Sequence, residues 1–317
     1  MKLLVTGGCG FVGSNLTHAL ANLGHEVVVL DDLSTGLRSN LKGLNVEIIE
    51  DSILNVDKYR NDFKDLDAIF HLGARGSVPR SIKNPVLTHE VNATATLRIL
   101  ELARLSGTHV IFSSSSSVYG RNGDLPKNEK MWLSPITPYA ASKLAGEGYV
   151  QAYAGSYEVP VTLFRFFNIF GPRQRPDHDY AAVIPKWIWS AMNNETIQVF
   201  GDGEQTRDFT YVDTVLNTLI KTVEEKIVSA EPINLAFGNR ISLNQVIALL
   251  KGHFPNLQVN FQGIRSGDVQ HSQNDPKLIN QLFSNIEITG FEDALNRTVE
   301  WLQQNHTQIV GGPKVVD

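Results

Sequence analysis

The N-terminal segment KLLVTGGCGFVGSNLTHAL, residues 2–20, has the pattern of a strand, a glycine-rich turn and a helix. Its apolar run at residues 3–6 predicts a strand, and apolar residues recurring every three or four positions over residues 11–20 predict an amphipathic helix. A glycine-rich turn, residues 7–13, joins the two, and a second strand is predicted at residues 26–30. Strand, turn, helix and strand in this order form a βαβ unit of a parallel sheet.

The same alternation continues along the first half of the chain. Short apolar or β-branched runs predict further strands at residues 46–49, 67–71, 109–113 and 161–165. Helical patterns separate them, including those at residues 92–105 and 139–153. We therefore expect a doubly wound α/β fold, with a mostly parallel sheet covered by helices on both faces.

Beyond residue 169 this regularity is lost. Gly171 and Pro172 break the chain before a loop that contains Pro, Asp and His. Helices are then predicted at residues 183–192, 212–225, 243–254 and 291–304, and strands at residues 197–200, 233–235 and 259–261. We expect a first domain over residues 1–169, a smaller α+β lobe over residues 170–308 from which the chain can return to the first domain, and a tail over residues 309–317.

Composition limits the possible partners. The 317 residues include 28 Lys and Arg against 33 Asp and Glu, a net charge of −5, so no basic field is available to attract nucleic acid. No run of about 18 apolar residues is present that could span a membrane. The single cysteine, Cys9, and the absence of a secretory signal favour a cytoplasmic protein. We assign no metal ligands.

The glycine-rich turn is typical of dinucleotide binding. Glycines at 7, 10 and 13 allow a tight turn, bring backbone N–H groups against a pyrophosphate at the helix N-terminus, and let helix and strand pack closely. Asp31 ends the second strand, where its carboxylate can accept the adenosine ribose hydroxyls and repel a 2′-phosphate. This pattern favours NAD over NADP. The alternatives are a turn without a ligand and a capping role for Asp31 and Asp32; we expect no redox role for Cys9.

A second motif, YAASK at residues 139–143, places Tyr139 and Lys143 one turn apart on a helix. A free tyrosine has a pKa of about 10, and a nearby ammonium and a positive nicotinamide would lower it toward that of a useful base. Such pairs also occur on solvated helix faces. Here five serines, residues 113–117, end a predicted strand at the sheet edge where ligands bind, although a serine-rich loop can also satisfy its own backbone.

These motifs together resemble the extended short-chain dehydrogenases/reductases, which have a Rossmann fold. Within them the chain is most similar to the NAD-dependent nucleotide-sugar epimerases and dehydratases, and closest to the UDP-glucose 4-epimerase-like members. The resemblance extends from residue 1 to about residue 304. Beyond the motifs above it includes HLGA at residues 71–74, Asn92, VYG at residues 118–120, RFFN at residues 165–168, RDF at residues 207–209 and RSGD at residues 265–268.

The resemblance implies a role for each matching residue. Tyr139 would be the catalytic base, Lys143 would hold the nicotinamide ribose and tune Tyr139, and Ser115 would hydrogen-bond the sugar's 4-oxygen. Asp51 and Ile53 would bracket the adenine. The diphosphate of a UDP-sugar would be held by Asn168, Arg207 and Arg265, with Asp268 on a uridine ribose or a neighbouring arginine.

Taken together, the expected sites are as follows. The cofactor-binding residues would be Gly7, Gly10, Phe11, Val12, Gly13, Asp31, Asp32, Asp51, Ile53, Leu72, Ala74, Asn92, Ser113, Tyr139, Lys143 and Phe166. The substrate-binding residues would be Ser77, Ser115, Ser116, Ser117, Tyr139, Asn168, Arg175, Ala182, Val183, Val199, Arg207, Arg265, Asp268 and Ser272.

The serine run also indicates the reaction. Dehydratases of this family place an acidic residue or an Asp-Glu pair after the catalytic hydroxyl residue, and decarboxylases tend to have Glu just before the VYG motif, because their chemistry needs a further acid or base. Ser116 and Ser117 occupy those places. Reversible oxidation at C4, and hence C4 epimerisation, is the simplest remaining chemistry. The alternatives are net reduction of a ketosugar, which does not need Arg207 and Arg265, and a non-catalytic NAD sensor, which would lack Tyr139 or Lys143.

Two residues bear on the identity of the sugar. Ser272 falls at the position beside the C2 substituent in 4-epimerases, where a small residue leaves space for an N-acetyl group. Arg175 lies in a loop that resembles that of uronate epimerases, in which an arginine faces a C6 carboxylate. Because those enzymes tend to have Thr where this chain has Asn168, we expect neutral UDP-hexoses and N-acetylhexosamines over uronates. Apolar helices at residues 93–105 and 144–153 either form a homodimer contact, as in relatives, or pack in the domain core.

Overall fold

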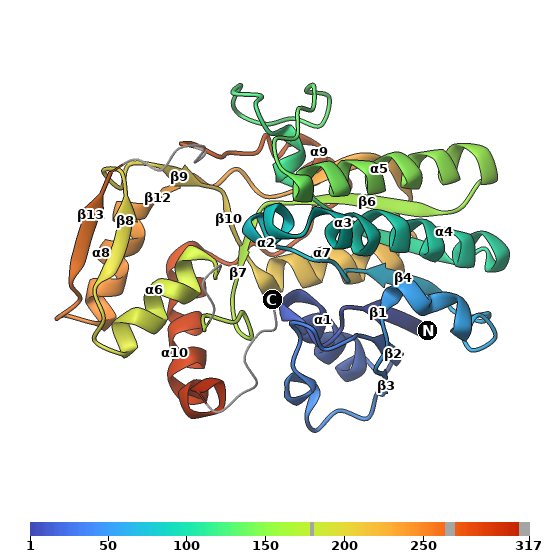
Figure 1. Cartoon of the computed structure of the whole chain (residues 1–317), viewed down its shortest axis with the longest axis horizontal. Helices are drawn as coiled ribbons and strands as arrows, with labels where there is room; N and C mark the ends of the chain where they lie inside the picture. Colours follow the sequence, from blue (N-terminus) through green and yellow to red (C-terminus); the bar gives the residue numbers. More distant parts are fainter. Residues whose placement is uncertain (178–180, 264–269, 311–317) are drawn as a thin grey trace.

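The computed structural model describes residues 1–177, 181–263 and 270–310. Its centre is a seven-stranded sheet, in the order β11-β6-β5-β4-β1-β2-β3, in which every neighbouring pair is parallel (Figure 1). The strands are β1 (Lys2–Thr6), β2 (Glu26–Leu30), β3 (Glu47–Ile49), β4 (Ala68–His71), β5 (His109–Ser115), β6 (Val161–Phe166) and β11 (Ser229–Leu235). The chain order changes direction between β1 and β4, and this confirms the predicted doubly wound fold.

Helices cover both faces of this sheet. On one face lie α4 (Ala95–Ser106) and α5 (Pro138–Tyr157), and on the other lie α1 (Phe11–Asn22) and α7 (Val212–Glu224) (Figure 1). In β1 the buried Leu3 packs with the α1 side and the buried Leu4 with the α4 side. Burial on both faces explains why the inner strands β1, β2 and β4 are nearly continuous apolar runs without polar alternation.

Short helices lie between β1 and β6 where the sequence analysis expected none. They are η1 (Arg38–Leu41), η2 (Ile53–Tyr59), α2 (Val78–Lys83), α3 (Pro85–His89) and η4 (Ser116–Tyr119). The side chains of Ser77 and Asn84 accept hydrogen bonds from the first turns of α2 and α3, and each helix has proline in its first turn. A π-helical turn, η3 (Glu90–Thr94), then leads into α4, so the helix expected at residue 92 begins earlier.

The second half of the chain forms a smaller group of elements beside the sheet. Its helices are α6 (Val183–Met192), α8 (Leu243–His253), α9 (Lys277–Leu282) and α10 (Phe291–Val310). Three strand pairs accompany them: β8 (Ile197–Phe200) with β13 (Val259–Gln262), β7 (Asn168–Phe170) with β10 (Phe209–Tyr211), and β9 (Thr206–Arg207) with β12 (Ile241–Ser242). Figure 1 shows β8, β13, α6 and α8 together at one end of the molecule.

Two elements from the range expected for the smaller lobe belong to the layers of the main sheet. The helix α7 packs beside α1, and β11 pairs with β6 at the sheet edge. The tail expected from residue 309 is wrong at its first two residues, because α10 continues through Val310.

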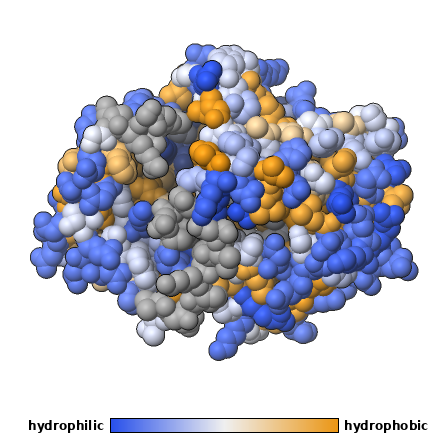
Figure 2. Space-filling model, in the orientation of Figure 1, coloured by the Kyte–Doolittle hydropathy of each residue, from blue (hydrophilic) through white to orange (hydrophobic). Residues whose placement is uncertain are grey.

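The surface in Figure 2 is mainly hydrophilic, with separate apolar patches. The more exposed apolar side chains include Ile82 of α2 and Val86 of α3, which are 64% and 67% exposed. No helix in the described part of the chain is both long enough and apolar enough to cross a membrane.

Candidate active site

A cavity of about 670 Å³ opens at the carboxyl ends of the central strands. Its lining runs from the glycine-rich turn after β1, past the ends of β4 and β5, to the loop after β7. Ligands of doubly wound sheets bind at this edge, where the strand order reverses. The cavity also has the size expected of a small-molecule site.

The glycine-rich turn forms the floor of one end. Gly7 has a φ of +69°, and a Cβ on Gly13 would collide with the carbonyl oxygen of Gly7. The helix α1 begins at Phe11, and its N-cap residue Gly10 provides no side-chain cap. The first N–H groups of α1 are therefore left for an anion, as the sequence predicts for a dinucleotide pyrophosphate.

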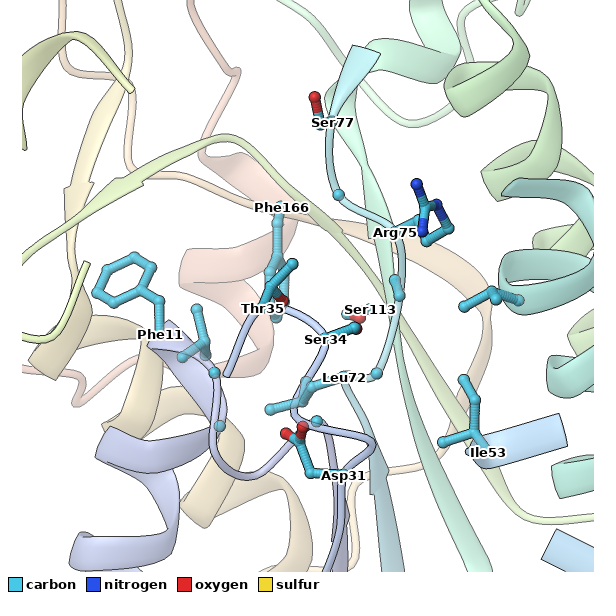
Figure 3. Close-up of a pocket in the computed structure, with 18 of the residues that line it drawn as sticks. Phe11, Asp31, Ser34, Thr35, Ile53, Leu72, Arg75, Ser77, Ser113 and Phe166 are labelled. Carbon is cyan, nitrogen blue, oxygen red and sulfur yellow. The ribbon is translucent and has the colours of Figure 1, made fainter. Parts of the chain in front are cut away.

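Asp31 lies at the end of β2 with its carboxylate in the cavity lining (Figure 3). Its two oxygens accept hydrogen bonds from the backbone N–H groups of Cys9, at 2.9 Å, and Leu33, at 2.8 Å. Burial raises the pKa of this carboxyl above its usual value. Each oxygen retains lone-pair capacity for a ribose hydroxyl, so the capping role and the ligand role are compatible. Asp32 also lines the cavity.

The wall beyond Asp31 differs in part from expectation. Ile53 lines the cavity together with Ser52 and Leu54, which the sequence analysis did not identify. The side chain of Asp51 is not part of the lining, because it accepts hydrogen bonds from Asn55, Tyr59, Lys58 and its neighbour Ser52. These bonds, that from Asn55 above all, lower the pKa of Asp51 to about 2.

Cys9 has no exposed surface, and burial raises the pKa of its thiol to about 12. The thiol stays protonated near neutrality and is a poor nucleophile. This agrees with the expectation that Cys9 has no redox role.

Tyr139 and Lys143 both face the cavity from the first turns of α5. The Lys143 side chain is buried, and its Nζ donates a hydrogen bond of 2.7 Å to the carbonyl of Ser113. Burial lowers the pKa of Lys143 to about 8, and the charge of Glu147 acts in the opposite direction.

The pKa of Tyr139 is raised, because burial outweighs its hydrogen bond with Ser115. Lys143 alone therefore does not lower it as expected from the sequence. The other positive charge expected to lower this pKa is that of a bound nicotinamide.

The five serines at the end of β5 lie in different surroundings. Ser113, Ser114 and Ser115 line the cavity, whereas Ser116 and Ser117 do not. The hydroxyl of Ser117 is buried and has no hydrogen-bond partner among the described residues.

Asn92 is buried in the π-helical turn η3 and supports the site from outside the cavity. Its Oδ1 accepts from the backbone N–H of Arg75 at 2.8 Å, and its Nδ2 donates to the hydroxyl of Ser142 at 2.9 Å. It thereby joins the loop after β4 to the helix that bears Tyr139.

The residues expected to bind the sugar nucleotide are only partly brought together. Ser77, Ala182 and Arg175 line the cavity with Ser115. The residues that do not line it are Asn168, Val183, Val199, Arg207 and Ser272. Arg265 and Asp268 lie outside the described residues.

Two of these arginines are engaged by the protein itself. Arg175 forms a bidentate ion pair with Asp177, at 2.9 and 2.5 Å. Arg207 donates to the backbone carbonyls of Thr206 and Gln270, at 2.9 and 3.3 Å.

Three further arginines of the lining were missed: Arg75, Arg80 and Arg173. Arg75 and Ser77 extend from the segment that follows β4 (Figure 3). Arg173 has a φ of +65° and donates to the Oδ1 of Asn15 on α1 at 2.6 Å. Their place in the sequence could have indicated them. Arg75 and Arg80 follow β4 and its HLGA motif, and Arg173 directly follows the Gly171-Pro172 break.

The sequence model of the NAD-dependent epimerase/dehydratase family matches residues 3–236. A UDP-glucose 4-epimerase of Mycolicibacterium smegmatis is 33% identical over 313 residues, which cover 96% of this chain and 99% of the relative.

Two solved structures are similar along nearly their whole length. The UDP-N-acetylglucosamine 4-epimerase of Methanobrevibacter ruminantium, in complex with UDP-N-acetylmuramic acid, has a TM-score of 0.91 and 35% identity over 96% of this chain and 98% of that one. The UDP-glucose 4-epimerase of Thermotoga maritima with UDP-glucose has a TM-score of 0.90 and 32% identity over 96% and 100%.

Proposed function

Because the chain belongs to the NAD-dependent epimerase/dehydratase family, we propose that it inverts C4 of a UDP-sugar through a transient 4-keto sugar. The observation that supports this most is the acid–base inventory of the cavity. Tyr139, Lys143 and Ser115 line it, and the only carboxylates among its described lining residues are Asp31 and Asp32, at the dinucleotide end. Dehydration needs a second acid and base beside the sugar.

Each residue of the cavity has a separate role in the proposed reaction. Bound NAD supplies the hydride acceptor and donor for C4. As its phenolate, Tyr139 takes the proton of the 4-hydroxyl and becomes a neutral phenol, and it later returns that proton. Ser115 holds the 4-oxygen by a hydrogen bond. Lys143 stabilises the tyrosinate by its charge. The open N-terminus of α1 and the carboxylate of Asp31 bind the cofactor's pyrophosphate and ribose.

For the substrate we propose a neutral UDP-hexose or N-acetylhexosamine. The guanidinium fork of Arg175, which a C6 carboxylate would require, is already paired with Asp177. A uronate would have to displace this carboxylate. The small Ser272 remains the proposed residue beside the C2 substituent, and Asn168, Arg207, Arg265 and Asp268 the proposed contacts of the nucleotide.

The test is incubation of the purified protein with UDP-glucose, UDP-N-acetylglucosamine and UDP-glucuronate, without added cofactor, and separation of the products. We expect C4 epimers of the two neutral sugars and no net consumption of NADH. A 6-deoxy product would instead identify a dehydratase, and stoichiometric NADH consumption a ketosugar reductase. A strong preference for UDP-glucuronate that is lost in Arg175→Ala would identify a uronate epimerase.

We further propose a cytoplasmic homodimer formed through α4 and α5. Most apolar residues of these helices are buried within the fold, but Leu105, Tyr149 and Tyr157 are 54%, 39% and 54% exposed. Sedimentation velocity of the protein, with Tyr149→Lys as the disrupting variant, tests the contact.

A further inference from the structure

One turn beyond Lys143 on α5, a buried carboxylate has no part in the proposed reaction. Glu147 is 2% exposed and forms an ion pair with Arg165 of β6, in which Nε donates at 3.0 Å and Nη2 at 2.8 Å. The hydroxyl of Ser114 donates to the same carboxylate at 2.5 Å. Glu147 thus joins three elements, α5, β5 and β6, directly behind the cavity wall.

Stability alone does not account for this pair. A buried ion pair generally stabilises a fold no better than apolar residues of the same size, because both charges lose their water. Apolar residues at positions 147 and 165 could not, however, accept a hydrogen bond from Ser114 or place a charge behind Lys143. The arrangement therefore requires a reason in the neighbouring site.

The hydrogen bond with Ser114 gives that reason. Ser114 stands between Ser113, whose carbonyl accepts from Lys143, and Ser115, which bonds to Tyr139. Fixing Ser114 therefore fixes the segment that positions both the ammonium and the hydroxyl. Near-attack geometry depends on such support, since small misplacements of reacting groups reduce rates strongly.

Arg165, in turn, is held on its far side. Its Nη1 donates to the hydroxyl of Tyr119 at 3.0 Å, and that hydroxyl donates to Asn234 of β11 at 2.7 Å. Asn234 donates to Asn274 at 2.9 Å, and the backbone N–H of Asn274 donates to Asp208 at 2.8 Å. These buried residues give Arg165 little freedom to move, so the carboxylate of Glu147 has a fixed place.

We propose that Glu147 is a positioning residue for Lys143 and Ser115, whose buried carboxylate, held by Arg165, fixes the ammonium and the serine strand against the reacting sugar. This inference rests on the proposed C4 epimerisation for its effect on turnover. Its effect on Lys143 does not depend on that activity.

The charges around Lys143 indicate what removal of the carboxylate does. Among the described residues, Lys143 interacts electrostatically with Glu147 on α5 and with His71 on β4. Tyr139 lies one turn before it on α5, and Arg165 of β6 is paired with Glu147. His71 is neutral at neutrality, since burial lowers its pKa to about 3. The negative charge of Glu147 favours the charged form of the lysine, so its loss lowers the pKa of Lys143 further.

The first test is Glu147→Gln, which keeps an oxygen for Ser114 but removes the charge. In the holoenzyme we expect kcat to fall by about 10–100-fold with KM nearly unchanged. The alkaline limb of the pH–rate profile and the pKa of Lys143, measured by ¹⁵N NMR of the lysine Nζ, should both move down by about one unit. Glu224→Gln, at an exposed position of α7, is the matched control.

Because Glu147→Gln leaves Arg165 buried without its partner, the double variant Glu147→Gln/Arg165→Met separates positioning from folding. Removal of both charges is expected to restore much of the lost stability. If kcat and the pKa of Lys143 remain low in the stable, folded double variant, the proposal is supported. If both kcat and this pKa return to their wild-type values, the proposal is overturned. Glu147→Asp should regain part of both values.

These readouts distinguish the two proposals. If the wild type does not epimerise any UDP-sugar but the pKa of Lys143 still falls in Glu147→Gln, the proposed function fails and the positioning role stands. If the pKa of Lys143 and kcat are both unchanged in a folded Glu147→Gln, the positioning role is overturned.

Discussion

Among single residues, the side chain of Tyr139 is the group that the proposed reaction cannot replace. Tyr139→Phe removes the proton acceptor and keeps the ring, so we expect turnover to fall by about 10²–10⁴-fold. The dissociation constant of the UDP-sugar, measured by calorimetry, should change little. Tyr149→Phe on the same helix, where the ring is 39% exposed, is the control. A near-normal rate in Tyr139→Phe would mean that another base operates.

Asp31 gives a second prediction at this scale. Asp31→Asn keeps the shape of the side chain but removes its charge, so the hydrogen bonds to the ribose lose their ionic part. Because such bonds contribute about 1.5–3 kcal/mol, we expect NAD affinity to fall by roughly 10–100-fold, with the preference against NADP reduced. Titration with NAD and NADP measures both, and Asp57→Asn, at an exposed ion pair, serves as control. Unchanged NAD affinity would assign Asp31 to capping alone.

Residues whose roles follow from local spacing could be located best from the sequence. Tyr139 and Lys143 share a helix face, and Asp31 ends a strand beside the glycine turn, so their presence in one cavity could be predicted. The surroundings of Asp51 and Arg175 could not, because their side chains bond to neighbours whose positions only the folded loops define. Arg75 and Arg173 were missed for the same reason.

Among the helices and strands, α1 lies so close to the end of β1 that the turn between them accepts only glycine at position 13. A methyl group on Gly13 would press against the backbone of Gly7, so Gly13→Ala should move α1 away from the strand. We expect weaker NAD binding and a lower Tm, measured by calorimetry and thermal unfolding. Gly148→Ala on α5, where a Cβ meets nothing within 4 Å, should be neutral or stabilising. Equal effects of both variants would contradict the close-contact explanation.

The strands β1, β2, β4 and β5 were predictable as elements because each contains a local apolar run that is buried on both faces. The pairing of β11 with β6 could not be predicted, since the two strands lie far apart in the sequence and no local sequence pattern indicates which strands pair. The short helices α2 and α3 were missed because their signals are only a cap and a proline.

The stability of the protein as a whole should depend on pH through His71. Burial lowers its folded pKa to about 3, whereas the unfolded chain binds a proton at about 6.5. The unfolded state therefore binds more protons between these values, and stability should fall with decreasing pH by at most about 1.4 kcal/mol per unit from this group. Urea unfolding at pH 7 and pH 5, with His71→Gln as the non-ionising variant, measures the effect. An equal pH dependence in both proteins would exclude His71 as its source.

The position of β11 also has a consequence for synthesis on the ribosome. The outer edge of β6 is covered by a strand that begins at Ser229, so a nascent chain that has released β6 exposes an unpaired strand edge until β11 follows. At about 5–20 residues per second this interval lasts for several seconds. An open edge of this kind invites pairing with other chains. We therefore expect that a fragment ending before β11 aggregates, and that the nascent chain is a client of ribosome-associated chaperones until β11 is added.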